Sequence, residues 1–186
     1  MSGLRLFLAC AGATACSVAH ASLSDDVIFI SEFVSEPAAI SDITSAHNVV
    51  RAGVGVAPLF WSEQLAATAQ AWANTCTAGD GTNSQIAHNP NRSVGYPFYV
   101  GENIASSTGT LGPQTAVNLW AAEAADYNYA TNTCAAGKVC GHYTQVVWAD
   151  SYRLGCGTAI CPNLLYSHVL VCNYGPGGNN GAGKPY

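Results

Sequence analysis

The groups that could carry chemistry in this 186-residue chain are two histidines and two glutamates, which stand out because charged residues are few. His88 lies in a polar segment, Glu102 and His142 each follow a glycine, and Glu123 lies three residues after a tryptophan. A carboxylate near apolar neighbours needs a partner, because burying an unpaired charge is costly. Neutral imidazoles are suitable partners, and two imidazoles with two carboxylates also suit a zinc-like cation. The residue types therefore predict paired His and Glu side chains or a divalent metal site.

The spacing of these four residues leaves ordinary explanations open. Their long separations match no short metal motif such as His-Glu-x-x-His, so each could equally be a loop or helix-surface residue. The sequence contains no Gly-x-Ser-x-Gly turn, phosphate-binding loop or dinucleotide fingerprint. The cysteines are better explained as disulfides than as nucleophiles. A binding protein is therefore favoured over an enzyme.

Composition narrows the partners that this chain can have. Charged residues make up 9% of the chain, against about 25% in ordinary globular proteins. Six basic residues and a net charge of −5 argue against nucleic acid and other anionic partners. A hydrophobic content of 49%, with four Trp and nine Tyr, excludes charge-rich disorder. We therefore expect a small folded protein with a neutral or apolar ligand.

Residues 1–21 have the pattern of a secretory leader. Arg5 is followed by an apolar run, and Ala19 and Ala21 are the small residues that a cleavage site requires. Cleavage after Ala21 predicts a secreted, extracellular protein. No later stretch reaches the roughly 18 apolar residues of a spanning helix, so no transmembrane segment is expected.

Removing the leader also removes Cys10 and Cys16 and leaves six cysteines. An even number in a secreted chain predicts three disulfides, but six cysteines allow 15 pairings and the residues alone do not choose among them. A zinc–cysteine site is the alternative, and no paired Cys-x-x-Cys supports it. The six are Cys76, Cys134, Cys140, Cys156, Cys161 and Cys172.

Helical patterns fill the first half of the mature chain. After an acidic extension (22–39), apolar residues recur at helical spacing over 43–54. Ser62 is a good N-cap for a second helix, and Gly112-Pro113 starts a third with Ala116, Val117, Trp120 and Ala124 on one face. Residues 77–113, rich in Gly, Asn, Ser and Pro, predict a long loop of the kind that is usually functional.

The second half has strand patterns. Residues 143–148 are rich in β-formers, 154–160 form a second short strand, and 166–174 alternate as a third. Helices followed by strands predict an α+β fold with an antiparallel sheet.

Two long motifs stand in the second half of the chain, Gly-His-Tyr-Thr-Gln-Val-Val-Trp at 141–148 and Val-Leu-Val-Cys-Asn-Tyr-Gly-Pro-Gly-Gly-Asn at 169–179. They resemble the first and second signatures of the CAP superfamily, which comprises the cysteine-rich secretory, antigen five and pathogenesis-related one proteins and is also called the SCP domain. Ala-His-Asn at 46–48, Gly-Glu-Asn-Ile-Ala at 101–105 and Trp-Ala-Ala-Glu at 120–123 match further positions. The resemblance covers 40–186, the predicted domain, and is greatest for the pathogenesis-related one type.

The resemblance implies an α-β-α sandwich, with a central antiparallel sheet between helical layers. It implies that His88, Glu102, Glu123 and His142 form one cleft, in which His88 and His142 hold zinc or another divalent cation in some relatives. The resemblance implies no required cofactor beyond this possible cation. The implied disulfides are Cys76–Cys161, Cys134–Cys140 and Cys156–Cys172.

The function implied is that of a secreted binding or defence protein, expected to be a monomer. Several relatives bind sterols or fatty acids through spaced aromatics, which Tyr127 and Tyr129 match here, whereas the third position is Cys134. A metal-assisted hydrolase with Glu102 or Glu123 as general base is the alternative activity.

Three further features carry expectations of their own. Tyr96, Phe98 and Tyr99 could form an apolar rim over the cleft or pack inward. The end of the chain resembles the family segment from which a signalling peptide is released, here residues 176–186, and the alternative is that it packs uncut. Asn91 heads an Asn-Arg-Ser glycosylation sequon.

Overall fold

The structure is a computed structural model, and it describes residues 35–186 except 80, 82, 83 and 182. The predicted leader (1–21) and most of the predicted extension (22–39) lie outside the described residues, so their boundaries stay predictions. The helices are α1 (Ile43–Gly53), α2 (Glu63–Ala73), α3 (Pro113–Ala122) and α4 (Gly141–Val146), with 3-10 turns η2 (Ala38–Ile40) and η3 (Glu123–Asp126). The strands are β1 (Phe60–Trp61), β2 (Gly101–Ser107), β3 (Tyr127–Asn128), β4 (Thr133–Cys134), β5 (Arg153–Ile160) and β6 (His168–Gly175).

Four strands form one sheet in the order β1-β5-β6-β2, and β3 and β4 form a separate hairpin. The central strand β6 is antiparallel to both β5 and β2, so the predicted antiparallel sheet is confirmed for these three strands. The short edge strand β1 pairs with β5 in parallel orientation through Phe60 and Trp61, which makes the sheet mixed at this edge.

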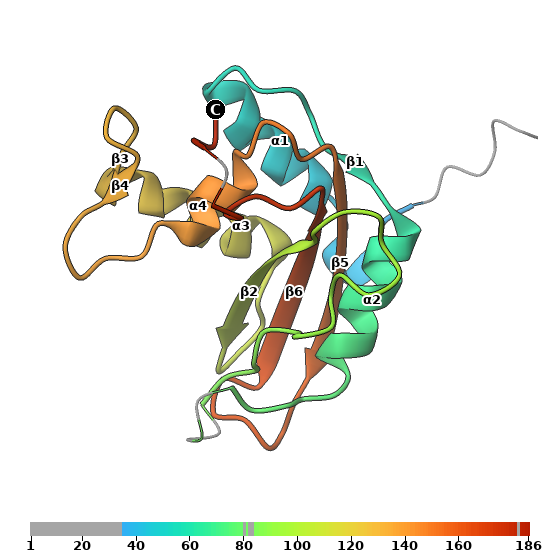
Figure 1. Ribbon diagram of the computed structural model, residues 1–186. Helices are drawn as coiled ribbons and strands as arrows, with labels where there is room; N and C mark the ends of the chain where they lie inside the picture. Colours follow the sequence, from blue (N-terminus) through green and yellow to red (C-terminus); the bar gives the residue numbers. More distant parts are fainter. Residues whose placement is uncertain (1–34, 80, 82–83, 182) are drawn as a thin grey trace, which may run out of the picture. The chain divides into compact units, whose positions relative to one another are not determined.

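Helices cover both faces of the sheet (Figure 1). Successive β6 side chains point to opposite faces, so Val169 and Val171 pack with α2 residues while Leu170 and Cys172 pack with α1, α3 and α4. The predicted α-β-α sandwich is therefore confirmed, with its larger core on the side of the three helices.

Two glycines let α2 lie directly on β5. A Cβ on Gly155 would lie 2.1 Å from the backbone nitrogen of Ala66, and one on Gly157 would lie 2.3 Å from Cα of Gln70. Both distances are far below any real Cβ contact, so only glycine permits this helix–strand approach.

The predicted helix starts are confirmed. The Ser62 hydroxyl accepts from the Leu65 N–H at 3.4 Å, and Pro113 occupies the first turn of α3. The Glu36 carboxylate accepts from the first two N–H groups of α1. Helix α3 ends at Ala122, so Ala124 was wrongly placed on its apolar face and is instead exposed in η3.

The prediction of a strand over 143–148 was wrong, because this segment begins in helix α4. Its β-branched residues favour strands only when a pleated neighbour is available. Here the Glu123 carboxylate accepts from the N–H groups of His142 and Tyr143, which satisfies orphan donors in the first turn of a helix. Tertiary contacts therefore override the local preference.

The prediction of one long loop over 77–113 was also wrong, because it contains strand β2. Gly, Asn and Ser are depleted in strands, so local composition hides it. Its register against β6 runs without interruption from Gly101 opposite Tyr174 to Ser107 opposite His168. Non-local pairing of this kind cannot be read from the segment alone.

All three implied disulfides are present. Cys156 and Cys172 lie directly opposite each other on β5 and β6. Cys76–Cys161 closes a loop of 85 residues between the ends of α2 and β5, and Cys134–Cys140 pins the short segment after the hairpin. Each contributes about 2–4 kcal/mol to stability.

One arginine is entirely buried. The Arg51 side chain on α1 donates to four backbone carbonyls at 2.7–2.9 Å, and burial lowers its pKa to about 10. These contacts tie α1 to the end of α4 and the loop that follows it. The four carbonyls belong to Ala57, Val146, Trp148 and Ser151.

Candidate functional site

The four predicted site residues come from four separate elements and meet as two His–Glu pairs. His88 lies in the loop before β2, Glu102 on β2, Glu123 at the end of α3 and His142 on α4. The sheet and the α3–α4 contact therefore bring together residues that are far apart in sequence.

The first pair joins an exposed imidazole to a buried carboxylate. Nδ1 of His88 lies 2.7 Å from Oε1 of Glu102, and the same oxygen accepts from the Asn89 N–H at 2.9 Å. The His88 side chain is 57% exposed, whereas that of Glu102 is 0% exposed. The buried glutamate therefore serves as the fixed partner that orients the exposed histidine.

The second pair is bound still more closely. Nδ1 of His142 lies 2.6 Å from Oε1 of Glu123, while Oε2 accepts from the backbone N–H groups of His142 and Tyr143 at 3.0 and 3.1 Å. The imidazole also stacks on Trp120, with ring centroids 6.3 Å apart. Both the backbone and the ring of His142 are thus held by one carboxylate.

Both histidines line a hollow of about 320 Å³. A carboxylate accepts hydrogen bonds, so each Nδ1 carries a hydrogen, and in the neutral ring the lone pair then lies on Nε2. No described residue bonds either Nε2, which leaves both nitrogens available to the hollow. Carboxylates orient metal-binding histidines in this same way. Other polar groups of the lining are Arg92, Asn103, Gln145 and Asn179, whereas Glu123 lies behind His142 and outside the lining.

A buried hydrogen-bond chain positions the backbone of His142. The Asn103 amide donates to the His142 carbonyl at 3.0 Å and to the Tyr174 hydroxyl at 3.1 Å. That hydroxyl donates to Nε2 of His47 at 2.8 Å, and Nδ1 of His47 donates to the Ile43 carbonyl at 2.7 Å. Burial lowers the pKa of His47 to about 4, so the ring is neutral near pH 7 and can accept the hydroxyl hydrogen.

The aromatic loop before β2 divides between the two expected roles. Tyr99 lines the cleft with Arg92 over its ring, at 5.4 Å from the centroid, so it forms part of the rim. Tyr96 instead bonds α2 through its hydroxyl, and its ring contacts Phe98 at 5.6 Å. Only one of the three aromatics therefore faces the cleft.

The other predicted positions lie away from the cleft. Tyr127 begins β3 and its ring lies 5.8 Å from that of Tyr143, while Tyr129 is in the hairpin turn and 42% exposed. Asn91 is exposed in a turn, and its glycosylation stays a prediction.

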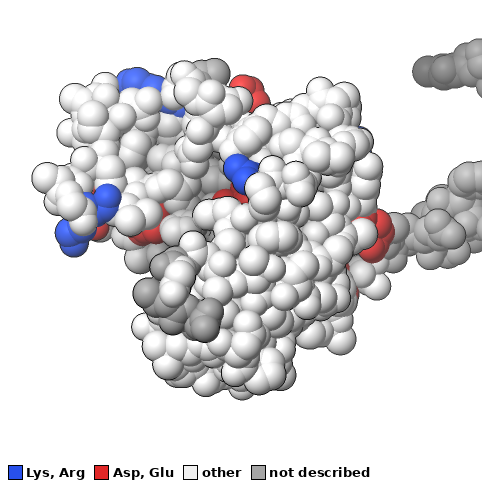
Figure 2. Space-filling model, turned by 60° about the horizontal axis from the view of Figure 1, so that its bottom comes forward, with Lys and Arg blue, Asp and Glu red and all other residues white. Residues whose placement is uncertain are grey.

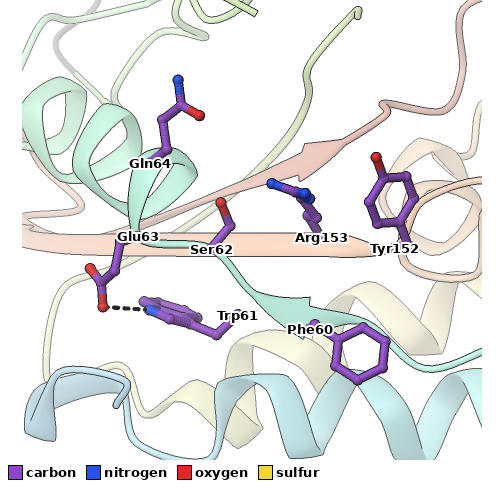
Figure 3. Close-up of a pocket in the computed structure, with 7 residues that line it drawn as sticks. All are labelled: Phe60, Trp61, Ser62, Glu63, Gln64, Tyr152 and Arg153. Atoms are coloured by element: carbon purple, nitrogen blue, oxygen red, sulfur yellow. Dashed lines mark hydrogen bonds between the residues drawn. The ribbon is translucent and has the colours of Figure 1, made fainter. Parts of the chain in front are cut away.

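A second hollow, of about 510 Å³, lies where β1 joins α2 (Figure 3). In that view the Trp61 indole donates to the Glu63 carboxylate at 3.1 Å, and the Arg153 guanidinium lies beside Tyr152. Its lining holds neither histidine nor a paired acid and base. We therefore place the candidate site in the smaller cleft, where oriented imidazoles supply the chemistry.

Charge is sparse around these features. Figure 2 shows one face that is mostly uncharged, with Lys, Arg, Asp and Glu confined to a few small patches. Within the described part of the chain, no three His, Cys, Asp or Glu side chains gather as metal ligands, and no helix is long and apolar enough to cross a membrane.

Comparison with known families shows which family the chain belongs to. The model of the cysteine-rich secretory protein family, CAP, matches residues 44–174, which include all four members of the two pairs. The chain belongs to the CAP family.

Plant relatives of this CAP chain are pathogenesis-related proteins. It is 46% identical to pathogenesis-related leaf protein 4 of Solanum lycopersicum over 145 residues, which cover 78% of this chain and 82% of the relative. It is likewise 46% identical to a pathogenesis-related protein 1 of Arabidopsis thaliana, with 78% and 81% covered. The resemblance to the pathogenesis-related one type is thereby confirmed.

Solved CAP structures share the fold. Venom allergen-like protein 4 of Schistosoma mansoni superposes with a TM-score of 0.63 at 27% identity, covering 81% of this chain and 94% of that one. The structure of NaASP2 with Zn²⁺ superposes with a TM-score of 0.61 at 22% identity, covering 82% of this chain and 89% of that one.

The prediction missed the polar groups that complete the cleft of this CAP domain. Asn103 and Gln145 lie inside the very motifs that carry the resemblance, next to Glu102 and near His142. Their place in those motifs was the available signal. Asn179 and Arg92 had none, because they reach the cleft through loop geometry.

Proposed function

We propose that this CAP protein is secreted and acts in defence by binding, and that its cleft holds a divalent cation through Nε2 of His88 and His142. One observation supports this above all: both imidazoles are held at Nδ1 by carboxylates and line the same hollow. The names of the plant relatives support a role in defence, and three disulfides are typical of secreted proteins.

The donor set fits zinc with open positions. Imidazole nitrogen is a preferred zinc ligand, and two protein ligands leave the remaining tetrahedral positions to water or to a bound ligand. The structure titled NaASP2 with Zn²⁺ shows that a protein of this fold was obtained with the ion, which agrees with the proposal.

Calorimetric titration with Zn²⁺ tests the site. His142→Ala is expected to weaken zinc binding at least tenfold because it removes a ligand, and Glu123→Gln about 10- to 100-fold because it loosens the histidine. His168→Ala is the matched control, since His168 begins β6 at the far end of the sheet from the cleft. Equal zinc affinity in wild type and His142→Ala would refute the proposal.

A metal-assisted hydrolase using the same cleft is the alternative. A general base needs a carboxylate oxygen that can reach water. Both oxygens of Glu123 are engaged, and the Glu102 side chain is buried with Oε2 unbonded by any described residue. This geometry favours a role in which the two glutamates orient the histidines over a role as general base in hydrolysis. Hydrolytic activity that disappears in His142→Ala would favour the enzyme.

We further propose that the β3–β4 hairpin contributes an apolar-ligand site, for a sterol or fatty acid. Tyr127, Tyr129 and Tyr143 place three rings at this end of the molecule, which supports the proposal. Cys134, which stands where the family pattern has a third aromatic, is committed to a disulfide. Secreted protein that carries no extractable lipid and takes up none after removal of residues 184–186 would refute it.

The chain as precursor of a signalling peptide, residues 176–186, is the remaining proposal. The junction is well held, because Gly175 is buried in β6 and the Ser151 hydroxyl donates to the Pro176 carbonyl at 2.5 Å. Release there requires the end of β6 to open. Mass spectrometry of secretions that finds only the intact C-terminus would count against release.

A further inference from the structure

The C-terminal segment, residues 183–186, is bound to the β3–β4 hairpin. The ring of Tyr186 stacks on that of Tyr129, with centroids 4.5 Å apart and planes inclined by 11°, and the Tyr129 hydroxyl donates to the Tyr186 carbonyl. Nζ of Lys184 donates to the Ala130 carbonyl at 3.0 Å and lies 4.7 Å from the Tyr129 centroid. Chain ends are usually free unless tied down, so these contacts mark a surface that recognises the segment.

The other two residues of the segment are bound as well. The Asn132 amide donates to the Gly183 carbonyl at 3.1 Å, and the Ala149 N–H donates to the Pro185 carbonyl at 2.6 Å. Pro185 is buried, although it is the penultimate residue of the chain. Every residue from 183 to 186 therefore has a partner in the body of the protein.

What the segment covers is aromatic. Tyr127, Tyr129 and Tyr143, the tyrosine surface, lie beneath or beside it, and the hydroxyls of Tyr143 and Tyr186 are 3.0 Å apart. A hollow of about 340 Å³ adjoins this surface, and both Tyr127 and Pro185 line it. The segment therefore covers the tyrosine surface and also lines the hollow, so its departure would expose the rings of that surface.

The described residues just before the segment are exposed. The chain is anchored up to Asn179, whose side chain accepts from the Thr144 hydroxyl and donates to the Gly141 carbonyl, both at 2.8 Å. Residues 180 and 181 are exposed, and Gly181 and Gly183 both have φ of 84°, a conformation that glycine adopts freely. Hydrogen-bonded residues thus lie on either side of exposed residues 180 and 181.

We propose that the C-terminal segment is a displaceable occupant of the tyrosine surface, which takes a flat apolar ligand of the sterol class when the segment leaves. This rests on the apolar-ligand part of the proposed function and adds the control of that site. The Tyr186 ring fills the position in which a flat ring system would stack on Tyr129. Segment and ligand compete, so the apparent association constant equals the intrinsic one multiplied by the fraction of molecules whose tyrosine surface is vacant.

Binding of the fluorescent sterol dehydroergosterol tests the proposal. Protein ending at Gly183 is expected to bind it about 10- to 100-fold more tightly than the intact protein, if the segment is docked in about 90–99% of molecules. Tyr129→Ala in the shortened protein should abolish that gain. Tyr166→Ala, which changes an exposed tyrosine in the β5–β6 loop, should not. Circular dichroism confirms that each variant is folded.

The outcomes separate the two proposals. Equal binding by intact and shortened protein overturns the control by the segment and leaves the apolar site standing. Absence of binding in both refutes the apolar site and the control together. A synthetic peptide of residues 179–186 must also displace the sterol from shortened protein, and the same peptide with Tyr186→Ala must not; failure of the first peptide likewise overturns the control.

Discussion

Replacing Arg51 by methionine is expected to lower the free energy of unfolding by about 4 kcal/mol or more. The guanidinium is buried and bonds four carbonyls, so methionine fills similar space but leaves buried acceptors without donors. Each unsatisfied buried group costs about 1–3 kcal/mol. Urea unfolding followed by tryptophan fluorescence measures the change.

Two further variants make this result interpretable. Arg153→Met removes an exposed guanidinium that stacks on Tyr152, and it should change stability by about 0.5 kcal/mol or less. Arg51→Lys keeps the charge with fewer donors and should lie between wild type and Arg51→Met. An Arg51→Met protein as stable as Arg153→Met would show that the four carbonyls find other donors.

Acid is expected to destabilise the fold through His47. Burial lowers its pKa from 6.5 to about 4, so between these values the unfolded chain binds a proton that the folded protein refuses. The stabilisation is complete above pH 6.5 and is lost as the pH falls toward 4, amounting to about 3 kcal/mol. Urea unfolding at pH 7, 5.5 and 4 measures the loss.

His47→Gln isolates this histidine from the carboxylates that titrate in the same range. The variant is expected to be less stable at pH 7, because glutamine cannot reproduce both bonds to Ile43 and Tyr174. Its stability should, however, fall less steeply toward pH 4 than that of wild type. Identical pH dependence in the two proteins would place the acid sensitivity elsewhere.

Sequence patterns predicted those elements whose signals are local. The Ser62 cap, Pro113 and the alternation over 166–174 correspond to α2, α3 and β6. Strand β2 was not predicted, because its Gly, Asn and Ser residues form a strand only through pairing with β6. Helix α4 was not predicted, because its helical conformation depends on the carboxylate of Glu123, about twenty residues earlier in the chain.

The candidate site was predicted by motif and not by spacing. His88, Glu102, Glu123 and His142 are joined by tertiary contacts, so no period in the sequence connects them. The orientation of each imidazole could not be predicted, because which nitrogen faces the hollow depends on each glutamate's position behind its histidine. The chain from Asn103 through Tyr174 to His47 likewise joins residues from three elements.

The packing of the last residue bears on how this protein should be produced. The Tyr186 ring stacks on Tyr129 and its carbonyl accepts from the same side chain, so the carboxyl end lies against the hairpin and not in open solvent. An affinity tag fused after Tyr186 must begin inside that contact and would push the ring away. Recombinant protein tagged at this end is therefore expected to differ in thermal stability from the untagged chain.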